Sequence, residues 1–118
     1  MVNRKNMMKE QVLHAVNNGE FDNDVIGSKE LVVVVMTQDW CPQWLNMRKW
    51  IYTVETEKEV DIYELIYNKS DYKNEFMSHK EEKWKNDQIP YLRYYMEGKL
   101  FKESNYINIE QFSSILSV

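Results

Sequence analysis

Apolar and polar residues alternate along this chain in blocks that predict an α/β fold. An uninterrupted apolar run, residues 31–36, lacks polar alternation and therefore predicts a central strand that is buried on both faces. Residues 60–67 and 91–96 are rich in β-branched and aromatic side chains, which favour strands. A tight turn at Glu97-Gly98 predicts that residues 100–102 form a hairpin with the strand before it.

Helical spacing marks the segments around these strands. Residues 5–17 place Met8, Val12 and Val16 on one helical face, although a short strand over residues 12–16 is an open alternative. The other predicted helices are residues 20–26, 42–56, 70–85 (capped by Ser70 or Asp71) and 109–118 (capped by Asn108).

The order of these elements predicts the architecture. A strand–helix–strand unit needs a parallel strand pair with a right-handed crossover, and the terminal hairpin adds an antiparallel edge. We therefore expect one domain over residues 1–118, built on a central mixed four-stranded sheet with helices on both faces.

Composition and charge narrow the classes of function. The chain has 118 residues, of which 43% are hydrophobic and 29% are charged, as in ordinary globular domains. A net charge of −4 without a basic stripe argues against nucleic acid as a partner. The N-terminal segment is too polar for a signal peptide and no stretch is long enough to span a bilayer, so no membrane association is expected. With only one cysteine, these features indicate a soluble cytoplasmic protein in a reducing compartment.

The candidate chemistry is concentrated in residues 40–44, Trp-Cys-Pro-Gln-Trp. Cys41 is the only cysteine, so the chain can form neither an internal disulfide nor a Cys-rich metal site, and we expect no metal and no cofactor. Pro42 favours the first turn of a helix, which places the Cys41 sulfur at a strand-to-helix junction. Unpaired backbone N–H groups and the helix dipole stabilise a thiolate there, so Cys41 is the candidate catalytic nucleophile.

Three segments stand in an order and at a spacing that point to a known superfamily. They are Phe21–Val25, in a short helix; Val33–Pro42, at the end of the apolar run; and Ile89–Leu100, at the start of the hairpin. Together they resemble the thioredoxin superfamily over most of the chain. The resemblance implies a thioredoxin-like α/β fold with a cis Ile89–Pro90 bond beside the cysteine. It also implies a groove where the Ile89 backbone pairs with an extended substrate; its residues are Trp40, Pro42, Trp44, Ile89, Pro90 and Tyr91.

The chain departs from this superfamily at the residues that support dithiol chemistry. Trp44 stands where disulfide-exchanging members usually have a second cysteine, and Val35 stands where thioredoxins have a buried aspartate. The lysine that partners this aspartate maps approximately to Glu64, and the groove glycine maps near Ser104-Asn105. The chain thus keeps the segments that resemble the thioredoxin fold, but lacks most of the residues that support dithiol exchange.

A single cysteine permits only half of dithiol chemistry. The Cys41 thiolate can attack a disulfide, but an external thiol must then release the mixed disulfide. The sequence therefore predicts monothiol thiol–disulfide exchange in cell redox homeostasis, with a protein or small-molecule thiol or disulfide as partner. Residues 41–44 do not match the Cys-Gly-Phe-Ser motif of cluster-binding monothiol glutaredoxins, so no iron–sulfur cluster is expected. The alternative is a non-catalytic peptide- or protein-binding module that uses the same groove, with Cys41 as a small buried hydrophobe.

Other residues carry weaker expectations. Trp40 is expected to form an apolar lip beside the thiol, whereas lip and core roles both stay open for Trp44. His14 and His79 have no partner at metal-ligand spacing and are expected on the surface or on a helix face. Residues 80–83 are expected to form a solvated helix face.

Overall fold

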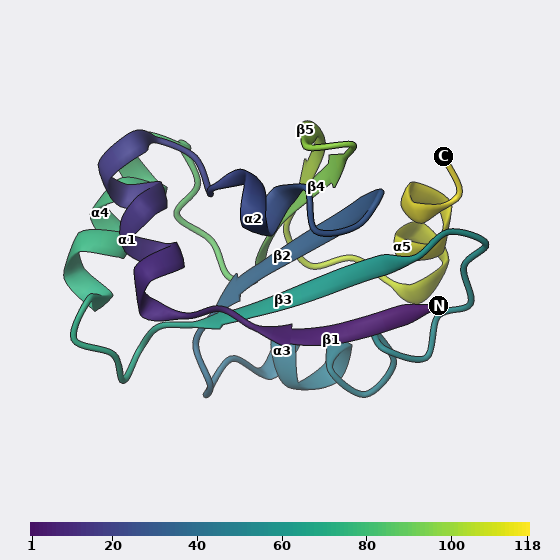
Figure 1. Ribbon diagram of the computed structural model, residues 1–118. Coiled ribbons are helices and arrows are strands. Elements are labelled where there is room, and N and C mark those ends of the chain that lie inside the picture. The colour runs from purple at the N-terminus through teal and green to yellow at the C-terminus, as the bar shows by residue number, and fades with distance from the viewer.

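A computed structural model describes residues 1–118 as three layers, with a five-stranded mixed sheet between two layers of helices (Figure 1). The strands are β1 (Val2–Asn6), β2 (Leu31–Thr37), β3 (Val60–Ile66), β4 (Tyr91–Met96) and β5 (Lys99–Ser104). The helices are α1 (Lys9–Asn18), α2 (Asn23–Ile26), α3 (Pro42–Met47), α4 (Lys73–Glu82) and α5 (Ile109–Leu116). The strands lie in the order β1-β3-β2-β4-β5, which confirms the predicted mixed α/β class.

The apolar run forms the central strand of this sheet, as predicted. All seven residues of β2 are buried, and the strand pairs in parallel with β3 and antiparallel with β4. Its alternate side chains enter two separate cores. Val32 and Val34 pack with α1, α2 and α4, whereas Val33 and Val35 pack with α3 and α5. Burial on both faces explains why the run has no polar alternation.

The sheet has one strand more than predicted. β1 pairs in parallel with β3 at an edge of the sheet, with Val2 opposite Val60. Val2 is the only apolar residue of β1, so no strand pattern marks this segment in the sequence. The alternative strand over residues 12–16 is wrong, because α1 buries Val12 and Ala15 on one helical face.

The helix after the cysteine is much shorter than predicted. α3 ends at Met47 instead of continuing to residue 56. Beyond it the chain tightens into turns with hydrogen bonds between residues three apart, such as Trp50 N–H to the Met47 carbonyl at 3.0 Å. These turns still bury Ile51 and Val54, so the apolar positions are occupied without a continuous helix.

The two C-terminal helices differ in their caps. α4 begins at Lys73, and neither Ser70 nor Asp71 caps it, because both side chains bond elsewhere. α5 is capped as predicted: the Asn108 side chain accepts a hydrogen bond from the Gln111 N–H at 2.8 Å.

Two polar residues of α4 lie on its buried face. His79 and Lys80 are 5% and 2% exposed, so the predicted solvated face over residues 80–83 is wrong for Lys80. Phe76 packs into the core, and helical spacing puts positions three and four residues later on the same side. The His79 ring packs on Trp84, with 4.4 Å between the ring centroids. The Lys80 ammonium donates to the Asn86 carbonyl at 3.0 Å, which satisfies only one of its N–H groups.

A buried arginine joins the same core to the segment before α2. Arg93 is 5% exposed and donates to the Tyr95 hydroxyl at 2.8 Å and to the Tyr91 hydroxyl at 2.9 Å. It also donates to the Glu20 carboxylate at 2.6 Å, and its guanidinium lies 4.1 Å from the Trp84 ring centroid. Burial lowers the pKa of Arg93, but Tyr95 and Glu20 more than offset this effect, so the group stays charged.

Substituting Lys80 should change how stability depends on pH. Burial lowers the pKa of Lys80 from 10.5 to about 8, so between these values the unfolded chain binds a proton that the folded chain has lost. As the pH rises from about 8 to 10.5, the free energy of unfolding of the natural chain should therefore increase relative to that of Lys80→Met. Urea unfolding from about pH 7 to about pH 10.5 measures it. Lys83→Met, at an exposed position, is the control; a difference for Lys80→Met that is independent of pH would contradict the buried amine.

Removal of the arginine should be costly. Arg93→Met leaves the Glu20 carboxylate and two tyrosine hydroxyls without their main donor. We expect the free energy of unfolding to fall by about 3 kcal/mol, as for other broken buried ion pairs. Urea unfolding at neutral pH measures the loss. Lys9→Met breaks an ion pair that is exposed at both ends and should cost much less, so equal losses would argue against the role given to Arg93.

Candidate functional site

Cys41 lies at the junction between the central strand and α3. It is the N-cap residue of α3, and Pro42 is the first residue of the helix. The Cys41 N–H donates to the Gln38 carbonyl at 3.2 Å, and the Cys41 carbonyl accepts from the Leu45 N–H at 3.0 Å. The turn after β2 therefore leads directly into the helix and holds the sulfur at the helix start.

The thiol faces a segment that is distant in the sequence. Cys41 Sγ lies 3.9 Å from the Ile89 carbonyl oxygen, and the Ile89–Pro90 peptide bond is cis. Cys41 belongs to the core beneath α3 and α5, and only 3% of the residue is exposed. The cysteine is therefore almost completely shielded from solvent.

The two tryptophans that flank the cysteine have opposite environments. Trp40 is 60% exposed, and its Nε1–H donates to the Gln38 side-chain oxygen at 2.8 Å. Trp44 is completely buried in the same core as Cys41, and its Nε1–H has no acceptor. Trp40 thus has the exposure that a lip requires, whereas Trp44, for which lip and core roles were both open, is a core residue.

The structure separates one predicted groove residue from the others. Ile89 is half-buried and packs against both cores, Pro90 is buried, and Pro42 is exposed on the first turn of α3. Tyr91 instead points to the opposite face of the sheet from Cys41. Its hydroxyl donates to Glu103 there, so its side chain does not line a groove at the thiol.

The resemblance matched Val35, and approximately Glu64, to the aspartate–lysine pair of thioredoxins. These two residues lie directly opposite each other in the pairing of β2 with β3. Glu64 is 6% exposed, forms an ion pair with Arg4 at 2.8 Å and accepts a hydrogen bond from the Tyr52 hydroxyl. Burial, followed by the contact with Glu64, raises the pKa of Tyr52. The site therefore has an apolar residue at the aspartate position and a neutralised carboxylate at the lysine position.

Two polar contacts that sequence reasoning missed hold the loops around the thiol. Asp39, after β2, accepts a hydrogen bond from the Asn68 side chain, after β3, at 2.8 Å. This bond, and a second one from Lys69, lower the pKa of Asp39. Asn105 donates to the Pro90 carbonyl at 3.0 Å. Asp39 and Asn68 follow neighbouring parallel strands, so their meeting could have been inferred. The resemblance places the groove glycine near Asn105, but no sequence signal predicts the bond from Asn105 to Pro90.

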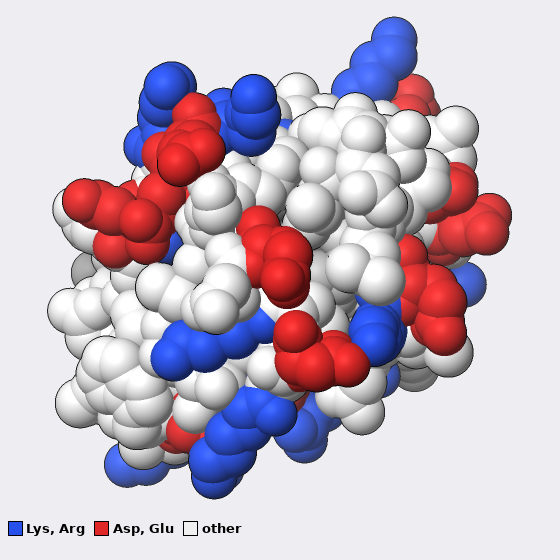
Figure 2. Space-filling view, turned by 90° about the vertical axis from the view of Figure 1, so that its left-hand side faces the viewer, with Lys and Arg blue, Asp and Glu red and all other residues white.

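Charge is mixed on the face that lies at the left of Figure 1. Figure 2 shows acidic and basic side chains beside each other over this face, with uncharged surface between them.

No three His, Cys, Asp or Glu side chains gather where they could hold a metal ion. None of the helices has the length and hydropathy needed to cross a membrane.

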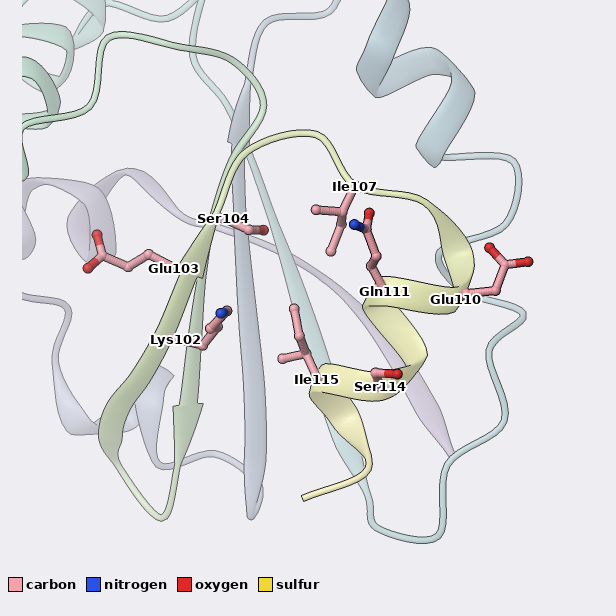
Figure 3. A pocket seen from close by; sticks show the side chains of 8 residues that line it. All are labelled: Lys102, Glu103, Ser104, Ile107, Glu110, Gln111, Ser114 and Ile115. Carbon is pink, nitrogen blue, oxygen red and sulfur yellow. The ribbon is translucent and has the colours of Figure 1, made fainter.

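A separate cavity lies between β5 and α5 (Figure 3). Its volume is about 480 Å³, and Ile107 and Ile115 form its apolar part. Lys102, Glu103 and Glu110 are its charged residues. None of the predicted site residues lines this cavity, so it is distinct from the surroundings of Cys41.

Comparisons with known proteins identify the fold. No protein-family model matches the chain, and no curated protein matches it in sequence. A mutant thioredoxin from Halobacterium salinarum NRC-1 matches in structure with a TM-score of 0.65 at 11% identity, over 98% of this chain and 87% of that one. Trxlp from Edwardsiella tarda gives 0.61 at 12% identity, over 98% and 100% of the two chains. Thioredoxin F from spinach chloroplast gives 0.59 at 10% identity, over 97% and 84%.

The protein therefore has a thioredoxin-like α/β fold over nearly its whole length. Identities this low establish the fold alone.

The two flanking tryptophans should differ sharply in their effect on stability. Trp44→Ala should lower the free energy of unfolding by about 3–5 kcal/mol, because it empties a fully buried position. Trp40→Ala, at an exposed position, should lower it by less than about 1 kcal/mol. Urea unfolding followed by circular dichroism compares the two variants. Similar losses would show that the two side chains are not divided between core and surface.

Proposed function

We propose that this protein carries out monothiol thiol–disulfide exchange, with Cys41 as its nucleophile. One observation supports this proposal most strongly: the only cysteine of the chain occupies the N-cap position of α3, and its sulfur lies 3.9 Å from the Ile89 carbonyl oxygen. An extended peptide that pairs with the backbone at Ile89 would bring its own disulfide next to this sulfur.

The proposed exchange has two steps, and the second step needs one co-reactant, an external thiol. First, the Cys41 thiol loses its proton to solvent and the thiolate attacks one sulfur of the substrate disulfide. A bond forms between Cys41 and that sulfur, the substrate S–S bond breaks, and the other sulfur leaves as a thiolate. An external thiolate then attacks the substrate sulfur of the mixed disulfide and displaces the Cys41 thiolate. The external thiol is required because residue 44 is a buried tryptophan and no second cysteine exists.

Burial restricts the substrates that we propose. With 3% of Cys41 exposed, a disulfide can react only if it fits closely against the protein next to the Ile89 carbonyl. The partners are therefore a protein or small-molecule disulfide that can approach this nearly buried sulfur, together with an external thiol. A reducing cytoplasm, in which a lone thiol stays reduced, is the compartment that suits this chemistry.

A second candidate is a non-catalytic module that binds a peptide or protein. The low exposure of Cys41 and the high exposure of Trp40 favour it, because an exposed indole is a common anchor in protein interfaces. In this case Trp40 and the Ile89 backbone would hold a partner segment without a covalent bond.

Formation of a mixed disulfide tests the proposed exchange. The folded protein, incubated with dithiodipyridine at neutral pH, should gain one covalent adduct per chain, which intact-mass spectrometry detects. Added glutathione or dithiothreitol should remove it, and Cys41→Ser should form none. With insulin and a thioredoxin reductase alone, no sustained turnover is expected, since Trp44 cannot resolve the intermediate.

Two results would contradict this function. Sustained insulin reduction with the reductase alone would overturn the monothiol mechanism. An adduct that forms only in urea would show that the folded thiol does not exchange, and would leave the binding module. Peptide binding that is equal for the natural chain and Cys41→Ser would support that module.

A further inference from the structure

One buried side chain connects the core of the protein to the exposed tryptophan beside the thiol. Gln38 lies in the turn between β2 and Cys41 and is 9% exposed. Its side-chain oxygen accepts the Trp40 Nε1–H at 2.8 Å, and its backbone carbonyl accepts the Cys41 N–H at 3.2 Å. The same residue therefore bonds to both members of the Trp40-Cys41 pair.

The Gln38 side chain lies close to the core. Burial raises the pKa of the Tyr67 hydroxyl, and the neighbouring Gln38 side chain lowers it, which partly offsets the rise. Tyr67 is 1% exposed and packs against Phe76, with 5.0 Å between the ring centroids. The acceptor of the Trp40 N–H is thus a nearly buried side chain that neighbours the core.

This arrangement matters because Trp40 has little else to fix it. An indole that is 60% exposed would sample several rotamers if packing alone restrained it. A hydrogen bond to a nearly buried acceptor restricts the ring to one orientation on the residue that directly precedes Cys41. The fixed ring then presents a flat apolar surface against which another aromatic group can stack.

We propose that Gln38 is a positioning residue that holds the Trp40 indole as a rim beside Cys41, so that the site prefers disulfides carrying an aromatic group next to sulfur. The preference rests on the proposed exchange function. The positioning itself is a property of the fold and can be measured without any reaction.

The reaction test compares two uncharged probes, dithiodipyridine as the aromatic disulfide and hydroxyethyl disulfide as the aliphatic one. Second-order rate constants for their reaction with Cys41 give an aromatic-to-aliphatic ratio. Comparison of this ratio among variants of one protein cancels the intrinsic reactivity of the probes. Gln38→Met removes the acceptor at similar size and should lower the ratio about fivefold, as expected for the loss of one hydrogen bond. Gln38→Glu keeps an acceptor oxygen and should preserve most of the ratio.

A double-mutant cycle separates positioning from a general effect on the fold. Trp40→Phe keeps a ring but removes the N–H donor, so it should lower the ratio as Gln38→Met does. In the Trp40→Phe background, Gln38→Met should then have no further effect, because the bond it would break is already absent. A full additional loss in that background, or an unchanged ratio in Gln38→Met alone, would overturn the proposal.

Hydrogen exchange of the Trp40 indole proton, followed by NMR, gives a readout that does not depend on activity. The proton should be protected in the natural chain and in Gln38→Glu, and should exchange faster in Gln38→Met. Equal exchange in all three would overturn the positioning role. If the natural protein reacts with neither disulfide, the exchange function and its aromatic preference both fail, while the indole measurement still decides whether Gln38 holds Trp40.

Discussion

The burial of β2 on both faces is the constraint on which the rest of the structure depends. None of its seven residues is exposed, so strands must pair along both of its edges and helices must cover both of its faces. Its register also sets the site. Met36 lies opposite Tyr91 in the antiparallel pair, which brings the Ile89–Pro90 segment alongside the turn that carries Cys41. The contact between two parts of the chain that are far apart in sequence is therefore a consequence of strand pairing.

The two faces of the sheet bury polar groups in different ways. Beneath α1, α2 and α4, the core includes the charged group of Arg93, neutralised by Glu20, and the amine of Lys80. Beneath α3 and α5, the thiol of Cys41 lies among apolar side chains, and Glu64 is paired with Arg4. The buried cations of the fold are thus on the opposite side of the sheet from the thiol. An apolar setting leaves Cys41 dependent on its backbone position for any activation.

The fold depends on apolar volume and strand order more than on the identity of the site residues. Solved structures with 10–12% identity share this fold over 97–98% of the chain. At position 44 a fully buried tryptophan fills the core and adds buried apolar surface. The site has one sulfur, one exposed indole and a nearly buried amide oxygen that accepts the indole N–H.

Features that depend on short-range patterns could be predicted from the sequence: the order of most elements, the central place of β2, the Asn108 cap and the position of Cys41 at a helix start. β1 could not, because its polar residues become a strand only when β3 provides backbone partners. The burial of Lys80 and the core position of Trp44 also depended on which elements pack together. The sequence by itself thus determined the α/β class and the location of the thiol. The tertiary structure alone decided that Tyr91 faces away from Cys41 and that Arg93 reaches Glu20, because strand register and helix packing, which join distant segments, determine which side chains meet.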